Sequence, residues 1–124
     1  MTDEWKALYE AAMSAVRYAE LPGGMTMGEV AAAVMGKSGR IYTGVCIDTA
    51  CSLGMCAERN ALGTMFTRGE YEFTRVVAVY QDGAILPPCG ACREFMLQTG
   101  QNPEIMLGEH ETVRLEALMP SGWQ

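Results

Sequence analysis

The hexapeptide PPCGAC, at residues 87–92, places two cysteines three positions apart behind a double proline. A Cys-x-x-Cys pair does one of two kinds of chemistry: it closes as a redox disulfide, or it gives two thiolates to a metal ion. One helical turn would let Cys89 and Cys92 both reach one zinc ion, at about 2.3 Å each. The pair therefore raises the question of where further ligands lie.

Cys56, in the segment GMCAERNAL, is the third candidate ligand. We expect both Cys56 and the Cys89/Cys92 pair to lie at helix N-termini, where exposed N–H groups and the helix dipole lower the pKa of a thiol. Three soft sulfur ligands favour zinc over hard cations. A structural zinc site adds a fourth protein ligand, whereas a catalytic site leaves that position to water.

Glu58 and Arg59 follow Cys56 closely enough to act on the same site. Glu58 falls in the same first helical turn, so its carboxylate could take a proton from water at the metal and pass it on, as a general base and then acid. Arg59 could hydrogen-bond a thiolate sulfur and so offset the excess negative charge that three thiolates leave on Zn²⁺. These neighbours favour a catalytic site over a structural one.

Other interpretations of the cysteines stay open at this point. Cys89 and Cys92 could be a thioredoxin-like redox pair, although that motif has no distant Cys-x-Glu partner. Cys51 could complete a closed Cys₄ zinc site, which would suit a non-catalytic, zinc-stabilised binding protein but would leave Glu58 without a role. The single histidine, His110, lies in the polar stretch GEHET and is interpreted as a solvated turn residue.

The hydrophobic pattern predicts the elements that position these residues. Apolar residues at helical spacing indicate helices, a continuous β-branched run indicates a buried strand, and two apolar runs around a short glycine-containing turn indicate a hairpin. Residues 112–124 fit either a strand and tail or a short closing helix. We expect helices at 3–20, 55–68 and 89–99, a hairpin of 29–35 and 40–47, strands at 74–80 and 104–107, and a loop at 82–88.

This order predicts one α/β domain over residues 1–124, a three-layer α/β/α sandwich with a mixed five-stranded sheet. Its 49% of hydrophobic residues suffices for a core without disulfides. The formal net charge of −6 argues against nucleic acid as a partner, because phosphate binding needs a basic patch. Five cysteines, without a secretory leader or membrane span, indicate a cytoplasmic protein.

Cys56-Ala57-Glu58 followed by PCGAC at 88–92 resembles the signature of the zinc deaminases. Cysteine as the first ligand is similar to the small homotetrameric cytidine deaminases, and the resemblance is close to the blasticidin-S deaminase group. The segments GRIYTGV, CAERNAL, PCGACRE and the closing LMPSGW all resemble this group. The resemblance covers most of the chain, from about GEVAAAVM onward.

The resemblance implies a fold, a reaction and a set of roles. Zinc would be held by Cys56, Cys89 and Cys92, and water activated by the metal would attack C4 of a cytosine ring. Glu58 would shuttle protons to N3 and to the leaving amino group, giving the uracil form and ammonia. The backbone around Ala57 and Cys89 would hydrogen-bond the base. The resemblance also implies a homotetramer whose pockets are closed by neighbouring subunits.

The resemblance weakens where the family binds ribose. Members of the family hold the sugar with an asparagine and a glutamate, for which this chain has Cys46 and Asp48. Gly28 and Glu29 occupy the region of a phenylalanine that packs near the sugar. Trp123 is expected to cover the substrate or to reach a neighbour's pocket, or else simply to pack against the protein. The substrate is thus expected to be cytidine, deoxycytidine, blasticidin S or, alternatively, another amino-heterocycle accepted by a rebuilt sugar site.

Overall fold

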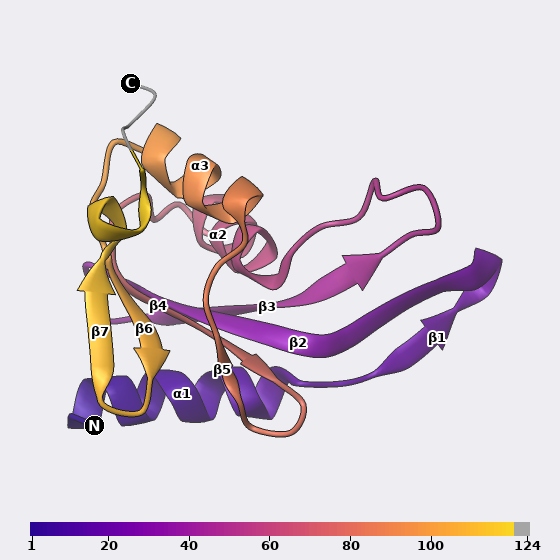
Figure 1. Ribbon diagram of the computed structural model, residues 1–124, viewed down its shortest axis with the longest axis horizontal. Helices are drawn as coiled ribbons and strands as arrows, with labels where there is room; N and C mark the ends of the chain where they lie inside the picture. The colour runs from indigo at the N-terminus through magenta and orange to yellow at the C-terminus, as the bar shows by residue number, and fades with distance from the viewer. Residues whose placement is uncertain (121–124) are drawn as a thin grey trace.

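The computed structural model describes residues 1–120 of the chain. Three α-helices, seven strands and two short 3₁₀ helices follow one another in these residues (Figure 1). In chain order they are α1 (Asp3–Ala15), β1 (Ala19–Leu21), η1 (Pro22–Gly24), β2 (Met25–Gly36), β3 (Ile41–Asp48), α2 (Ala57–Thr67), β4 (Phe73–Tyr80), β5 (Ile85–Leu86), α3 (Gly90–Gln98), β6 (Glu104–Gly108), β7 (Glu111–Arg114) and η2 (Leu115–Leu118).

All seven strands join one mixed sheet. Five of them run side by side in the order β3-β2-β4-β6-β7, and only the β4–β6 pair is parallel. The other two are short: β1 pairs with the part of β2 that β4 does not reach, and β5 pairs with β4 beyond the end of β6. The five-stranded mixed sheet that the sequence predicts is therefore present, with two short strands added.

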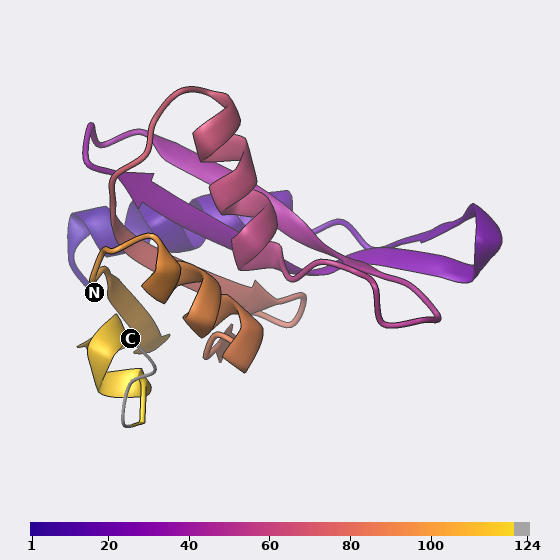
Figure 2. The ribbon, with the colours of Figure 1, turned by 90° about the horizontal axis from the view of Figure 1, so that it is seen from above.

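Helices cover both faces of this sheet, as the three-layer prediction requires (Figures 1 and 2). A hydrophobic core lies on each face of the sheet. Alternate residues of β2 pack into one core or the other because successive side chains in a strand point to opposite faces. Ala32 and Val34 pack with α2 and α3, whereas Ala31 and Ala33 pack with α1. Both faces are buried, which explains why β2 and β4 read as continuous apolar runs.

Helix α1 ends earlier than its apolar spacing predicts, so the expected helix over 3–20 is wrong in its last turn. The Thr2 side chain caps its start, and Val16, with φ −56° and ψ 127°, has already left the helical conformation. Ala19 pairs with Met27 in the β1–β2 ladder. Backbone pairing to an open stretch of β2 therefore overrides the helical periodicity at this point.

The remaining boundaries lie close to the predicted ones. The strands predicted at 29–35 and 74–80 extend to Met25–Gly36 and Phe73–Tyr80. The loop at 82–88 contains the two-residue strand β5. The ambiguous C-terminal stretch contains both a strand, β7, and a short helix, η2. No helix within residues 1–120 has the length and apolar character needed to cross a membrane.

Candidate active site and metal centre

A backbone bridge brings the N-terminus of α2 to the end of β3. The N–H of Ile47 donates to the carbonyl of Met55 at 2.9 Å, and the reverse bond is 2.8 Å. This pair closes the intervening loop and places Cys56 beside the end of β3. Cys56 is the N-cap residue of α2, but its side chain caps no N–H group. Its sulfur is thus available to another partner.

Close packing fixes α2 on β3. A Cβ atom at Gly44 would lie 2.3 Å from the backbone nitrogen of Ala61, a distance that no real Cβ tolerates. Glycine at this position therefore allows the helix backbone to rest directly on the strand. The Asn60 side chain adds a bond from Nδ2 to the carbonyl of Val45, at 3.0 Å.

The second Cys-bearing helix, α3, begins immediately after the double proline. Cys89 is its N-cap residue and, like Cys56, makes no capping bond with its side chain. Arg93 holds this turn together, because its Nε donates to the carbonyl of Pro88 at 3.0 Å and its Nη1 donates to the carbonyl of Leu118 at 3.4 Å. No specific signal in the amino-acid pattern pointed to this structural role of Arg93.

The two helix N-termini bring three sulfurs together. The Sγ atoms of Cys56, Cys89 and Cys92 all lie within 4.8 Å of one another, and those of Cys56 and Cys89 are 3.2 Å apart. Cys51 is not in this group: it is exposed and its sulfur contacts the Thr49 hydroxyl at 3.5 Å. The structure thus brings together the three sulfurs expected from the sequence and leaves out the fourth sulfur of the Cys₄ alternative.

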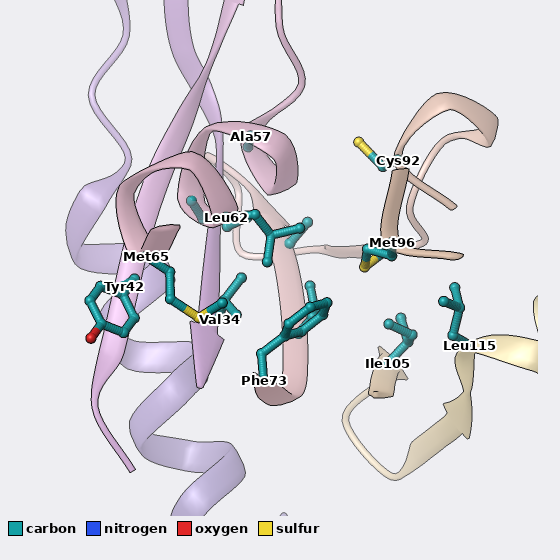
Figure 3. Close-up of a cluster of buried hydrophobic side chains, with 14 of the residues drawn as sticks. Val34, Tyr42, Ala57, Leu62, Met65, Phe73, Cys92, Met96, Ile105 and Leu115 are labelled. Carbon is teal, nitrogen blue, oxygen red and sulfur yellow. The ribbon is translucent and has the colours of Figure 1, made fainter. Parts of the chain in front are cut away.

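The chemistry of this donor set fits zinc. Cys92 is fully buried at the end of a hydrophobic cluster (Figure 3), and burial raises the pKa of its thiol, as does the negative charge of Glu58. Burial also opposes ionisation of Cys89, but its pKa is lowered because the Cys92 backbone N–H and the Cys56 side chain favour the thiolate. Three converging thiolates repel one another, and a soft dication that takes sulfur ligands removes this repulsion.

Glu58 points its carboxylate into the same site. It is the one buried charged side chain among the described residues, with 5% of its surface exposed. Oε1 accepts a hydrogen bond from Sγ of Cys92 at 3.8 Å. Burial raises the pKa of this carboxyl, although the Glu58 N–H, the Cys92 thiol and the charge of Arg59 partly offset the effect. A carboxyl with these properties suits proton transfer near neutral pH.

Arg59 contacts the sulfur cluster, as expected from the sequence. Its Nη2 donates to Sγ of Cys56 at 3.6 Å, and this bond raises the pKa of the guanidinium further. The same bond opposes the rise that burial causes in the pKa of Cys56. Arg59 therefore supplies positive charge on the side of the cluster that faces α2.

A cavity of about 500 Å³ opens onto this cluster. Its volume is in the range of small-molecule sites. Ala57, Cys46 and Asp48, the candidate substrate-binding residues, line it together with Cys56 and Glu58. Trp123, the fourth candidate, lies outside the described residues. The exposed His110 is not part of the cavity lining.

Glu29 also lines the cavity, although sequence reasoning assigned it no role. Three residues of β2, 28–30, stand opposite the single residue Cys46, because Met27 pairs with Ile47 and Ala31 pairs with Val45. Gly28 has φ +84°, which favours glycine, and this bulge places Glu29 at Cys46. A bulge of this kind depends on strand register, so the amino-acid pattern gave little sign of it.

Glu29, Cys46 and Asp48 form a second cluster, which we call the acidic wall. One polar atom from each lies within 4.8 Å of the others. Cys46 is buried and its Sγ donates to Oε1 of Glu29 at 3.7 Å. Burial raises the pKa of the Glu29 carboxyl, and hydrogen bonding and charge repulsion with Asp48 raise it further.

Sequence comparison indicates the same class of protein as the geometry of the site does, a zinc-binding protein. Residues 3–109 match the family model described as the cytidine and deoxycytidylate deaminase zinc-binding region. The chain is 30% identical over 100 residues to a probable cytidine deaminase of Dictyostelium discoideum, covering 79% of this chain and 67% of that protein. It is 29% identical over 103 residues to a blasticidin-S deaminase of Bacillus cereus, covering 73% of this chain and 74% of that protein.

Coverage of the relatives varies. A match to a cytidine deaminase of Halalkalibacterium halodurans, 36% identical over 72 residues, covers 56% of this chain and about half of that protein, 54%. The crystal structure of cytidine deaminase from Mycobacterium tuberculosis aligns over 100% of this chain and 99% of that one, with a TM-score of 0.83 and 27% identity. The fold of the described residues is thus shared with that enzyme.

These findings define the chain as a zinc-binding α/β protein with a cavity beside a cluster of three cysteines. It belongs to the cytidine and deoxycytidylate deaminase family, as the resemblance in the sequence implied. Its cofactor is zinc, and the cluster of Cys56, Cys89 and Cys92 is able to hold a metal ion.

Proposed function

We propose that the chain hydrolyses the exocyclic amino group of a cytosine ring in a free nucleoside or nucleoside analogue, giving the uracil form and ammonia. The observation that carries this proposal is the position of Glu58. Its buried carboxylate lies 3.8 Å from a sulfur of the three-cysteine cluster and faces the cavity that this cluster lines. In a closed structural zinc site, four protein ligands leave no position for water, so a buried carboxylate beside the site would have no proton to transfer.

The protein's own groups carry the proton transfers in this proposal. Zinc, when bound, supplies the Lewis acidity that makes water nucleophilic near neutral pH. Glu58 takes a proton from that water and delivers it to N3 of the ring as the C4–O bond forms. It then passes the second proton of the water to the amino nitrogen as the C4–N bond breaks, so that ammonia leaves. Burial, which raises the pKa of the Glu58 carboxyl, suits this double use.

The remaining lining residues orient the ring. Ala57 is the first residue of α2 and is buried at the cavity wall, so its backbone is near the ring that the cluster would act on. Cys89 lines the same wall at the start of α3. Arg59 holds the Cys56 sulfur and offsets negative charge there. Cys46 and Asp48 line the part of the cavity that the substituent of the ring would occupy.

Free nucleosides and their analogues suit the chain better than polynucleotides do. The formal net charge of −6 opposes binding of a phosphate backbone. Cytidine, deoxycytidine and blasticidin S remain the proposed substrates, and another amino-heterocycle is the alternative because Cys46 and Asp48 depart from the family's sugar-binding residues.

We further propose that the chain forms a homotetramer in the cytoplasm. All five cysteines are free, which suits a reducing compartment. Phe95 and Tyr71 are exposed beside Phe66 at a groove between α2 and α3, and burial of such aromatic surface would stabilise an assembly. Light scattering on the purified chain tests the mass of the assembly, and a monomer would contradict it.

Ammonia release tests the proposed reaction. Zinc-loaded protein is incubated with cytidine, deoxycytidine, cytosine and blasticidin S, and ammonia is measured beside the fall in cytosine absorbance. We expect equal amounts of ammonia and uracil-form product from at least one of these compounds. Ammonia from none of them, by protein that holds one zinc per chain, would contradict the proposal and favour a non-catalytic zinc protein.

A further inference from the structure

The acidic wall of Glu29, Cys46 and Asp48 lies in the same cavity as the metal cluster. Its residues come from β2 and β3, whereas the sulfurs come from the N-termini of α2 and α3. A substrate ring held at the sulfurs would extend its substituent toward another part of the cavity lining. Among the described residues, Glu29 and Asp48 are the charged residues of that lining other than Glu58 and Arg59, so the wall bears on which substituent is accepted.

No positive side chain compensates the acidic wall within the described residues 1–120. The single ion pair found there joins Lys37 to Glu72 and is remote in sequence from the cavity lining. Arg59 is the one basic residue among the described residues that line the cavity, and it is bound to Cys56. Two carboxylates therefore face the cavity without a cation.

Neutral and cationic substituents differ in the hydrogen bonds that they donate to the acidic wall and in whether they neutralise its charge. A sugar hydroxyl donates one hydrogen bond to a carboxylate and leaves its charge uncompensated. An ammonium or guanidinium group donates several bonds and also neutralises the charge of the carboxylates. Burial raises the pKa of the Glu29 carboxyl, and the hydrogen bond and charge of the nearby Asp48 raise it further. A cation placed between the two carboxylates would relieve this repulsion.

Cys46 strengthens this arrangement. Its side chain is 7% exposed, and its thiol is a weak hydrogen-bond donor that is already used on Glu29, at 3.7 Å. Cys46 therefore offers little to a sugar but holds the Glu29 carboxylate in place at the bulge of β2. Glu29 and Asp48 are then the groups that select the substituent.

We propose that the acidic wall makes this protein specific for cytosine compounds whose ring substituent carries a positive charge, an ammonium or guanidinium group, in preference to neutral ribose. The inference rests on the proposed deaminase function and names the substrate class of that same site. Glu29 and Asp48 are specificity-determining residues in this account, and Cys46 is a positioning residue.

A matched pair of substrates tests the inference on the unaltered zinc-loaded enzyme. In 5′-amino-5′-deoxycytidine an ammonium replaces one hydroxyl of cytidine, and in cytidine 5′-monophosphate the same position is anionic. We expect kcat/KM for the amino compound to exceed that for cytidine by about tenfold, equivalent to about 1.4 kcal/mol. Raising the salt concentration should narrow this ratio. The monophosphate should be the poorest substrate.

Single charge-removing variants then locate the effect. Glu29→Gln and Asp48→Asn should each lower the amino-to-cytidine ratio of kcat/KM at least threefold. Glu10→Gln removes one negative charge, as the two wall variants do. Glu10 is exposed on α1, on the face of the sheet opposite to the cavity, so this variant should leave the ratio unaltered. The ratio is the readout because a general loss of folding or of zinc would lower both rates together.

The outcomes separate this inference from the function on which it rests. Ammonia from cytidine at a rate equal to or above that from the amino compound would overturn the charge preference and leave the deaminase function standing. A preference that persists in both acidic-wall variants would also overturn it. Failure of every cytosine compound to release ammonia would overturn the proposed function itself.

Discussion

Oε1 of Glu58 lies 3.8 Å from Sγ of Cys92, and both side chains are withdrawn from solvent. The carboxylate comes from α2 and the thiol from α3, so neither helix alone makes the site. Both helices rest on the same face of the sheet, with their N-termini together (Figure 2). The packing of the helices on the sheet therefore sets the geometry of the proposed catalytic group and of the proposed metal ligands.

Replacing Glu58 by glutamine should separate zinc binding from turnover. The three sulfurs are untouched, so the variant should retain one zinc per chain, but it loses the group that moves protons. Ammonia release should fall by a factor of about 10²–10⁴. Metal analysis and ammonia release on one preparation check this, with Glu10→Gln as the charge-matched control. Near-normal turnover with zinc retained would contradict the role of Glu58.

Replacing either of two exposed cysteines by serine should affect zinc binding differently. Cys89 belongs to the three-sulfur cluster and Cys51 does not. Cys89→Ser should therefore release zinc to a competing chelator at far lower chelator concentrations, whereas Cys51→Ser should match the unaltered protein. Zinc content after dialysis measures both. Loss of zinc from the Cys51 variant would revive the closed Cys₄ site and exclude an open position for water.

Gly44 and Gly63 provide a matched test of how α2 is held. A methyl group at Gly44 would strike the backbone of Ala61, so Gly44→Ala should lower the free energy of unfolding by about 1–3 kcal/mol and weaken zinc binding. Gly63 lies within α2 with nothing near its missing Cβ, so Gly63→Ala should raise that free energy by about 0.5–1 kcal/mol. Denaturant unfolding measures both, and a fully stable Gly44→Ala protein would contradict the close packing.

Glu29→Gln should change how stability depends on pH. Because the Glu29 carboxyl has a raised pKa in the fold, the folded chain keeps a proton that the unfolded chain releases, so its ionisation costs stability as pH rises. Glutamine cannot ionise. The variant should therefore be more stable than the unaltered protein at pH 7, and the difference should shrink as the pH is lowered toward the ordinary range of a carboxyl.

Unfolding curves at several pH values, with zinc present for both proteins, measure this difference. Glu10→Gln, which removes a carboxylate outside the cavity, is the control. A Glu29→Gln protein less stable than the unaltered one at pH 7 would mean that Glu29 is already paired with a cation, contrary to the description of the acidic wall.

The cysteines proposed as metal ligands could be singled out from the sequence because their signal is local. Cys56 with Glu58, and Cys89 with Cys92, lie within single helical turns, and the start of a helix is visible in the sequence pattern. Buried strands such as β4 are equally clear, because both faces are covered and the apolar run is unbroken. In the structure, Cys56 and Cys89 lie at the helix N-termini that the pattern indicates, and their sulfurs are close together.

The acidic wall could not be predicted because it depends on register. Cys46 and Asp48 were identifiable only by resemblance, and Glu29 reaches them through a bulge that allows three residues of β2 to face one of β3. The early end of α1 has a similar cause, since the pairing of Ala19 with Met27 is a non-local contact. Periodicity along the chain carries no information about either.

One measurement tests the central claim most directly: ammonia release from the cytosine compounds by the purified chain, before chelator treatment, after it, and after zinc is restored. We predict one zinc per chain, ammonia release that stops when zinc is removed, and release that returns in proportion to the zinc restored. Turnover that continues without zinc, or a chain with one zinc that acts on none of these compounds, would contradict it.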